Sequence, residues 1–291
     1  MSREYTRRGF IKAGLAATAG AAVMGPGGAA AANRELLAGE NQSKQTWWVA
    51  ADPHVAYEGY EEFLKTSVQD VNNLESDYAI ILGDLFEDDR AFLPQFYEEI
   101  GGLATDWTYI LGNHDYDDNT GAPILPVRYF HTDVAGIRII ALSDEMLEDE
   151  PHRTELGRNQ DRWFKQGLDE APEAPTLIMT HQCPIADRRS VSAFDEWLAE
   201  SIGDYNIVLW IVGHAHRWMI DENIEGYGFD RLKVGSICRK HGDRRPCESA
   251  MLTFEDLGEQ ARISVRFRNH ENEEWITVAD RERYERVLDK G

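Results

Sequence analysis

Metal-ligating side chains follow five short apolar runs in this chain. WWVAA (47–51) precedes Asp52 and His54, YAIIL (78–82) precedes Asp84, WTYIL (107–111) precedes Asn113, His114 and Asp115, TLIMT (176–180) precedes His181, and NIVLWIV (206–212) precedes His214 and His216. Carboxylate, amide and imidazole groups are hard oxygen and nitrogen donors that suit many metal ions without a thiolate. The pattern therefore predicts a metal centre.

The number of donors indicates how many metal ions this centre holds. The candidate ligands are Asp52, His54, Asp84, Asn113, His181, His214 and His216. A single catalytic zinc takes three protein ligands and a water, so seven candidates favour two cations with one carboxylate between them. Two cations roughly 3.5 to 4 Å apart hold a phosphoryl group and generate hydroxide near neutral pH. The chemistry predicted is hydrolytic phosphoryl transfer.

The apolar runs are the elements that must position these donors. Short runs rich in Ile, Val and aromatic residues, bounded by Gly, Pro or Asp, indicate buried strands. Between the first two runs, residues 58–76 carry apolar side chains at helical spacing. Strand, helix and strand in succession predict a parallel crossover, and ligands bind at the carboxyl ends of such strands. A lone histidine there is usually structural and a Gly-Asp pair is usually a turn, but five occurrences favour a site.

The overall charge excludes some classes of partner. The 291 residues carry a formal net charge of −22, which argues against a nucleic-acid-binding surface or docking on anionic membranes, since both need a basic face. Seven of the 30 basic residues are lysines. An acidic, lysine-poor composition resembles proteins of salt-loving (halophilic) microbes, and an ordinary acidic soluble protein is the alternative.

The first 45 residues are expected to act as a targeting segment. Arg7 and Arg8 precede a weakly apolar stretch of small residues that ends in alanines around Ala30 to Ala32, which is the order of a signal peptide. The paired arginines resemble a twin-arginine (Tat) export signal, which implies passage through the Tat translocon to an extracellular or cell-surface location. A flexible low-complexity tail is the alternative. No transmembrane span is predicted elsewhere.

Residues 46–291 are then expected to form one catalytic domain. Cys238 and Cys247 either pair as a disulfide, which an exported protein permits, or remain thiols. Two helices are predicted in the second half of the domain. One lies around residues 193–202, between His181 and His214, and an amphipathic one covers the last fifteen residues. The sequence does not predict the oligomeric state.

Five motifs resemble those of the calcineurin-like metallophosphoesterase family. They are DPH (52–54), GD (83–84), GNHD (112–115), the lone His181 and GHAH (213–216), and they stand in the family's order. The resemblance covers about residues 46–268. It implies a four-layer αββα sandwich, an α/β fold of two mixed β-sheets flanked by helices, with the site in loops at one edge.

The resemblance also implies roles for individual residues. Asp52, His54, Asp84 and His216 would hold the first metal, and Asp84, Asn113, His181 and His214 the second, with Asp84 bridging. His114 would donate a proton to the leaving group or hold the phosphate. Asp115 either orients that imidazole or is only a loop or helix-start residue. The metals would be Mn, Fe, Zn or Co.

The expected function is hydrolysis of small phosphodiesters or phosphomonoesters, with attack by a hydroxide generated between the two metals. Protein phosphatases of the family carry GDxxDRG, whereas this chain reads GDLFEDDR (83–90), which argues against that activity. Two alternatives are a metal-binding or scaffolding protein of the same fold with little catalysis, and a metallohydrolase of other esters or amides. The complete ligand set argues against the first, and the GNHD context against the second.

Overall fold

The computed structural model describes residues 43–56, 61–143, 145–147, 150–155, 158–182, 201–224, 227–238, 247–277 and 282–290. Nearly all of the expected export signal (1–45) and most of the helix expected around 193–202 lie outside this part of the chain. Within it, no helix is long and apolar enough to cross a membrane.

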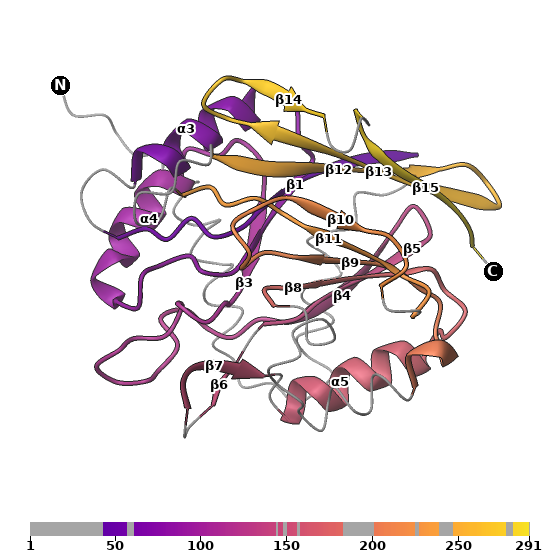
Figure 1. The fold of residues 1–291 in the computed structure, drawn as a ribbon, viewed down its shortest axis with the longest axis horizontal. Helices are drawn as coiled ribbons and strands as arrows, with labels where there is room; N and C mark the ends of the chain where they lie inside the picture. The colour runs from indigo at the N-terminus through magenta and orange to yellow at the C-terminus, as the bar shows by residue number, and fades with distance from the viewer. Residues whose placement is uncertain are drawn as a thin grey trace.

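A seven-stranded mixed sheet contains the first three apolar runs (Figure 1). Its strands are β1 (Lys44–Ala50), β2 (Tyr78–Leu82), β3 (Trp107–Ile110), β12 (Glu248–Asp256), β13 (Gln260–Asn269), β14 (Glu274–Ile276) and β15 (Tyr284–Asp289), in the order β14-β13-β12-β1-β2-β3, with β15 also on β13. Strands β1, β2 and β3 pair in parallel, and β12 pairs with β1 antiparallel. The crossover predicted between β1 and β2 is therefore confirmed.

A six-stranded mixed sheet contains the other two apolar runs. Its strands are β4 (Phe130–Val134), β5 (Ile137–Ala141), β8 (Thr176–Thr180), β9 (Ile207–Val212), β10 (Met219–Asp221) and β11 (Asp230–Lys233), in the order β10-β11-β9-β8-β5-β4. The pairs β5–β8, β8–β9 and β9–β11 are parallel. A separate hairpin joins β6 (Glu145–Leu147) to β7 (Glu150–Glu155).

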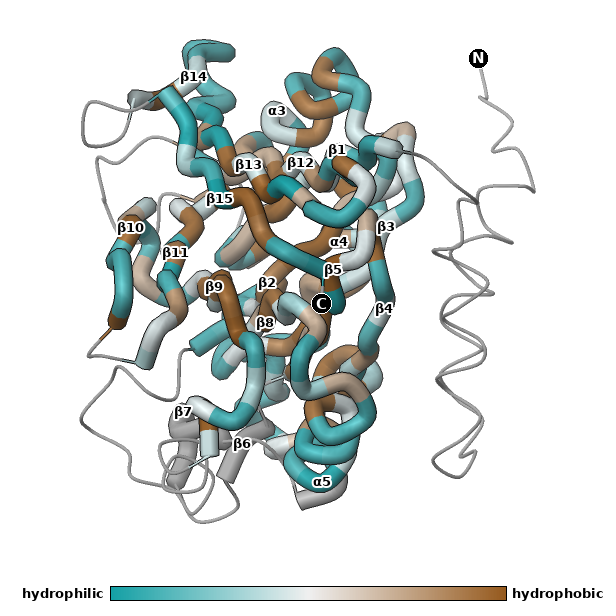
Figure 2. Tube along the Cα trace, turned by 90° about the vertical axis from the view of Figure 1, so that its right-hand side faces the viewer, coloured by the Kyte–Doolittle hydropathy of each residue, from teal (hydrophilic) through white to brown (hydrophobic). Residues whose placement is uncertain are grey.

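Helices cover the outer faces of both sheets. They are α3 (Glu61–Asn72) and α4 (Leu93–Ile100) on the larger sheet and α5 (Arg158–Asp169) on the smaller one, with short 3₁₀ turns at Arg90–Phe92 and Ile202–Asp204. Side chains alternate along β1, so Trp47 packs between the sheets while Trp48 packs against α3 and α4. Figure 2 shows the hydrophobic segments in the interior of these layers. The predicted αββα sandwich is confirmed.

The end of the chain is a strand where the sequence suggested a helix. Residues Tyr284–Asp289 form β15, which pairs antiparallel with β13. Tyr284 and Leu288 are buried in the core between the sheets, and Glu285 and Val287 face outward. The spacing of the two buried residues fits period 2 as well as a helix, and the free edge of β13 supplies the hydrogen bonds that decide for a strand. The helix prediction is wrong.

A buried polar network ties α3 to the larger sheet. Asp70 accepts two hydrogen bonds from Arg268, at 2.8 and 2.7 Å, and its Oδ2 lies 2.8 Å from His270 Nδ1. His270 Nε2 lies 2.6 Å from Ser249 Oγ, which accepts a hydrogen bond from the Trp48 indole. Burial raises the pKa of Asp70, but the hydrogen bonds from Arg268 and His270 outweigh it and lower the pKa to about 2.

Removing Arg268 would leave the buried Asp70 carboxylate without the positive charge that compensates it. We expect Arg268→Met to lower the free energy of unfolding by about 3–5 kcal/mol. Arg262→Met on the same strand is the control, because Arg262 forms a partly exposed ion pair with Glu255 and should cost no more than about 1 kcal/mol. Urea unfolding at pH 7 measures both, and equal losses would contradict a special role for the buried pair.

Candidate metal centre

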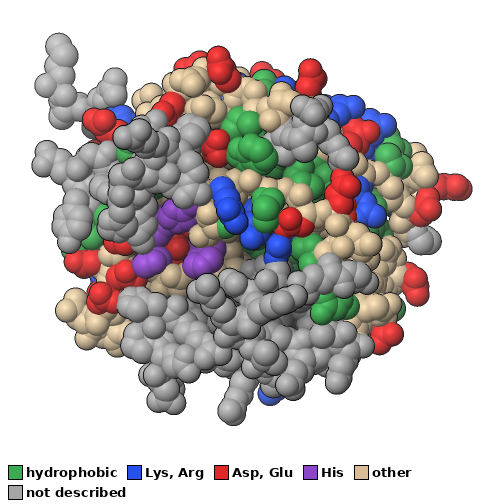
Figure 3. Space-filling model, in the orientation of Figure 1, with side chains coloured by type: hydrophobic (Ala, Val, Ile, Leu, Met, Phe, Trp, Pro, Cys, Tyr) green, Lys and Arg blue, Asp and Glu red, His purple; other side chains and the backbone are tan. Residues whose placement is uncertain are grey.

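The predicted donors lie where strands of both sheets end. Asp52 follows β1, Asp84 follows β2, and Asn113 and His114 follow β3, while His181 and His214 follow β8 and β9. Backbone hydrogen bonds join neighbouring loops within each sheet: Asp52 N donates to Gly83 O (3.1 Å) and Gly213 N to His181 O (3.1 Å). Figure 3 shows histidine side chains gathered on one face beside acidic ones.

Five of the predicted ligands have a left-handed backbone. The φ angles are 53° for Asp52, 43° for His54, 51° for Asp84, 59° for His214 and 49° for His216. Residues other than glycine rarely adopt this backbone region. Each residue that its surroundings hold there costs about 1–3 kcal/mol. The left-handed residues depart from the alternating directions of a strand, so His214 and His216 need not point to opposite faces. Strain concentrated in this way is typical of functional sites.

One group of donors comprises Asp52, His54, Asp84 and His216, whose ligand atoms lie within 4.8 Å of one another. His54 Nε2 lies 3.2 Å from His216 Nε2, and His216 Nε2 lies 3.4 Å from Asp52 Oδ1. Asp52 also accepts a hydrogen bond from the His214 backbone N–H at 3.0 Å, which fixes its carboxylate.

A second group comprises Asp84, His181 and His214. His181 Nε2 lies 3.1 Å from Asp84 Oδ2, and its Nδ1 lies 2.7 Å from Leu82 O, so Nε2 is the ring nitrogen that faces the site. Burial, and then the charge of His181, lower the pKa of His214 to about 4, which keeps its imidazole neutral as metal binding requires. Asn113 is buried beside them, and its Oδ1 accepts a hydrogen bond from Gln182 Nε2 at 2.9 Å.

The Asp84 carboxylate belongs to both groups. Its Oδ2 lies 3.5 Å from His54 Nε2 and 3.1 Å from His181 Nε2, one imidazole from each group. Its Oδ1 accepts the backbone N–H of His114 at 2.8 Å, which fixes the carboxylate plane. Burial raises the pKa of Asp84, but His181, His54 and His114 hold it well below its ordinary value. Asp84 is therefore placed as a bridging ligand would be.

These residues fit bound cations. Asp52 and Asp84 are fully buried, and buried carboxylates need a compensating positive charge. The His54 and His216 ring nitrogens face each other at 3.2 Å, where two neutral nitrogen lone pairs would repel unless a proton or a cation lay between them. The donors are oxygen and imidazole nitrogen, which suit Mn, Fe, Zn or Co.

Two roles were considered for Asp115, orienting His114 or holding a loop, and its contacts are those of a loop residue. Its Oδ1 accepts the backbone N–H groups of Leu85 (2.6 Å) and Phe86 (3.2 Å), and its Oδ2 accepts that of Gly112 (2.7 Å). Burial, and then the charge of Asp84, raise the pKa of Asp115 to about 8. Asp115 thus joins the loops after β2 and β3, and the expectation that it orients His114 is corrected.

The carboxylate beside His114 is instead Asp88. Asp88 Oδ2 lies 2.7 Å from His114 Nδ1, and the neighbouring Glu87 Oε2 lies 2.9 Å from His54 Nδ1. Sequence reasoning noted Glu87 only as a departure from GDxxDRG and did not identify Asp88. The signal was the acidic run after GD in GDLFEDDR, where the left-handed backbone of Asp88 (φ 55°) turns its side chain toward the GNHD loop.

Two glycines let the loops approach closely. A Cβ on Gly83, whose φ is 77°, would lie 2.6 Å from Gly112 N and 2.8 Å from His181 Nδ1. A Cβ on Gly112 would lie 2.6 Å from Asp84 N and 2.8 Å from His181 Cδ2. Neither space admits a methyl group, so the glycines set the spacing of the donors.

We expect Gly112→Ala to reduce both metal content and melting temperature, because the added methyl group pushes Asp84 and His181 apart. Gly203→Ala is the matched control, since no described atom beyond its own turn and chain neighbours lies within 4 Å of its Cβ position, and it should change neither quantity. Elemental analysis and thermal unfolding measure the two effects. Full metal content in Gly112→Ala would show that the close approach of these loops is not required for binding.

The family model for calcineurin-like phosphoesterases matches residues 46–218, more than half of the chain. The chain belongs to this family. No curated protein matches it. Its fold is similar to that of a dimetal phosphatase from Danio rerio, with 13% identity, a TM-score of 0.60, and coverage of 85% of this chain and 99% of that one.

Two further solved structures share the family's fold with this chain. Purple acid phosphatase PPD1 from yellow lupin has 14% identity and a TM-score of 0.59, over 84% of this chain and 54% of that one. GAP50, described as the anchor in the inner membrane complex of Plasmodium, has 14% identity and a TM-score of 0.57, over 85% and 89%. Identities this low establish the fold alone.

Proposed function

We propose that this protein is a dinuclear metal-dependent phosphoesterase that hydrolyses small phosphomonoesters or phosphodiesters. The observation that carries the proposal is the pair of donor groups that share Asp84, one with Asp52, His54 and His216 and the other with His181 and His214. Asn113 in the adjoining loop completes the second group. Two proteins of similar fold, a dimetal phosphatase and a purple acid phosphatase, support the same reaction class.

Bound cations would supply charge to the phosphoryl oxygens and activate a water near neutral pH. The chain's own residues prepare the site for them. Glu87 contacts His54 Nδ1 and Leu82 O contacts His181 Nδ1, so both rings are held with Nε2 toward the donors. The Asp52 and Asp84 carboxylates are fixed by backbone N–H groups, so little reorganisation is needed when substrate binds.

His114 is the proton donor in this proposal. Its Nδ1 faces the Asp88 carboxylate at 2.7 Å, which stabilises the protonated ring and leaves Nε2 for the substrate. Its ring centre lies 5.1 Å from that of His54, and its side chain is 22% exposed, so it borders the metal centre from the solvent side. A protonated imidazole there can donate to the departing alkoxide oxygen.

Turnover of bis-nitrophenyl and mono-nitrophenyl phosphate by the metal-reconstituted protein tests the function. We expect hydrolysis of at least one of them, loss of activity with a chelator, and its return with added metal, at high or low salt. Metal bound with no hydrolysis of either compound under both salt conditions would contradict the proposal and favour the scaffolding alternative.

Variants of three neighbouring residues test the assigned roles. His114→Ala should lower kcat by about 10²–10⁴-fold with metal retained, because general acid catalysis contributes that much. Asp88→Asn should lower kcat by about tenfold and shift the pH profile of kcat, since it acts through His114.

Glu87→Gln is the matched control for Asp88→Asn, since it neutralises the adjacent carboxylate, which contacts a metal ligand instead. It should weaken metal affinity while kcat at saturating metal stays near wild type. An Asp88→Asn variant with the kcat and pH profile of the wild type would contradict the His114–Asp88 pairing.

A further inference from the structure

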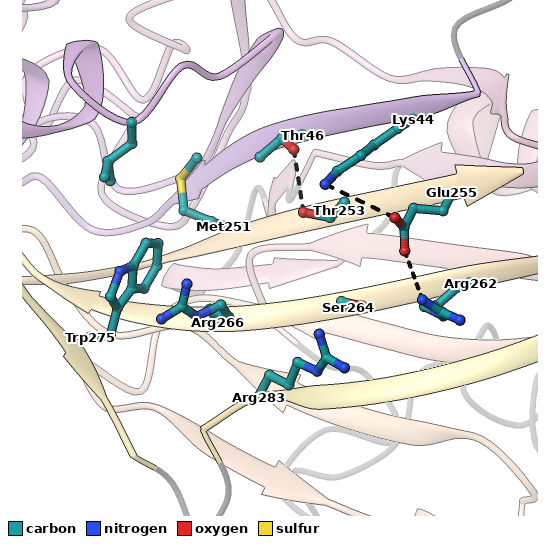
Figure 4. Close-up of a pocket in the computed structure, with 11 residues that line it drawn as sticks. Lys44, Thr46, Met251, Thr253, Glu255, Arg262, Ser264, Arg266, Trp275 and Arg283 are labelled. Atoms are coloured by element: carbon teal, nitrogen blue, oxygen red, sulfur yellow. Dashed lines mark hydrogen bonds and ion pairs between the residues drawn. The ribbon is translucent and has the colours of Figure 1, made fainter.

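A groove lies on the outer face of the larger sheet, away from the metal centre. It has a volume of about 330 Å³ and is lined by side chains of β1, β12, β13 and β14, together with Leu74 after α3 and Arg283 just before β15 (Figure 4). We call it the outer-sheet groove; its lining includes Lys44, Thr46, Thr253, Arg262, Arg266 and Arg283. Thr46 lies near the start of β1 and Asp52 follows its end. At 3.2–3.4 Å per residue this separates the groove from the metal centre by roughly 20 Å.

Hydroxyl groups form the floor of the groove. Thr46 pairs with Thr253 across β1 and β12, and Thr253 pairs with Ser264 across β12 and β13. Directly opposed residues in a sheet project from the same face, so the three hydroxyls form one row. Thr46 Oγ1 and Thr253 Oγ1 lie 3.3 Å apart. Ser264 Oγ donates to Glu285 Oε2 at 3.5 Å, so the threonine hydroxyls are the donors that the row offers to a ligand placed above it.

Basic side chains flank this row on both sides. Lys44, Glu255 and Arg262 stand opposite one another two residues along the strands in one direction. Glu255 accepts from Arg262 at 3.2 Å and lies 4.0 Å from Lys44, so one carboxylate faces two positive groups. In the other direction stand Arg266 and Arg283, and Figure 4 shows both side chains beside the hydroxyl row.

Arg266 is the least compensated of these groups. Its guanidinium lies 3.8 Å from the centre of the Trp275 ring, which holds it in place. Arg283 by contrast is 2.9 Å from Glu285. Among the described residues, Arg266 has no hydrogen bond or ion pair with a carboxylate. Burial, and then the charges of Arg268 and Arg283, lower the pKa of Arg266 against the effect of Glu282.

The chain as a whole carries a net charge of −22. Four basic side chains around the outer-sheet groove therefore contrast with the rest of the protein. With Glu255, Glu285 and the Glu282 carboxylate that acts on Arg266 all counted, the four basic groups leave an excess of one positive charge. Basic groups on both sides of a row of hydroxyls match an anion with oxygens on several sides, whereas a planar carboxylate would engage one side. We propose that the outer-sheet groove binds a tetrahedral oxyanion, a phosphate or sulfate group, independently of the metal centre.

Equilibrium dialysis of the full, metal-loaded chain with radiolabelled sulfate tests this site, with ionic strength fixed by KCl. We expect Arg266→Gln to raise the sulfate Kd about tenfold or more, the loss of one charge-assisted hydrogen bond. Arg283→Gln, at a side chain that is 57% exposed, should act in the same direction, and it keeps the test valid should Arg266→Gln fail to fold. The sulfate concentration that halves turnover should stay at its wild-type value in both variants, because it reports the metal centre.

Arg162→Gln is the matched control, since it removes one positive charge from an exposed position on α5, which covers the other sheet. It should leave the sulfate Kd unchanged. Equal sulfate binding by the wild type and the two groove variants would overturn the proposal. An equal loss in Arg162→Gln would also overturn it, because only bulk charge would then be at work. Displacement of sulfate by glutarate at equal charge would assign the groove to carboxylates and reject the tetrahedral anion.

Discussion

Two buried carboxylates, Asp52 and Asp84, lie among four imidazoles at the junction of the two sheets, and their charge has to be compensated. Histidines in the neutral form that binds metal do not compensate it, and burial, followed by the charge of His181, lowers the pKa of His214 to about 4. Backbone N–H groups orient the two carboxylates, but they do not neutralise them. Cations held between the donors satisfy this constraint, and the arrangement of loops around them follows from it.

The fold meets this constraint by bringing the ends of five strands to one place. Parallel pairing sends β1, β2 and β3 in one direction, and β8 and β9 supply the remaining loops from the second sheet. The ligand residues then turn through left-handed backbone conformations, whose cost must be met by the surrounding contacts. Asp115 contributes three of these contacts by accepting backbone N–H groups from two loops. Gly83 and Gly112 provide the close approach that any side chain would block.

Much of this arrangement was predictable from sequence, because buried strands are marked by apolar runs and the donors follow each run directly. The family resemblance assigned His216 with His54 and His214 with His181, and each pair lies in one group of candidate donors. The contact of His114 with Asp88 was not predicted, because it depends on a loop turn that no periodicity records.

The strand β15 was missed because the spacing of Tyr284 and Leu288 fits a helix as well as a strand, and only pairing with β13 decides between them. The row of hydroxyls in the outer-sheet groove depends on the register of three strands, which sequence does not give. Cys238 and Cys247 are both buried, and no disulfide joins them to each other in the described part of the chain.

In the proposed function, Asp84 would lie between two metal ions. Anomalous diffraction from crystals of the metal-reconstituted protein tests it directly, because each bound transition metal gives a peak at its absorption edge. We expect two peaks roughly 3.5 to 4 Å apart, one beside His54 and His216 and the other beside His181 and His214. The Asp84 carboxylate should contact both metal ions. A single peak at full metal occupancy, or two peaks of which only one adjoins Asp84, would contradict it.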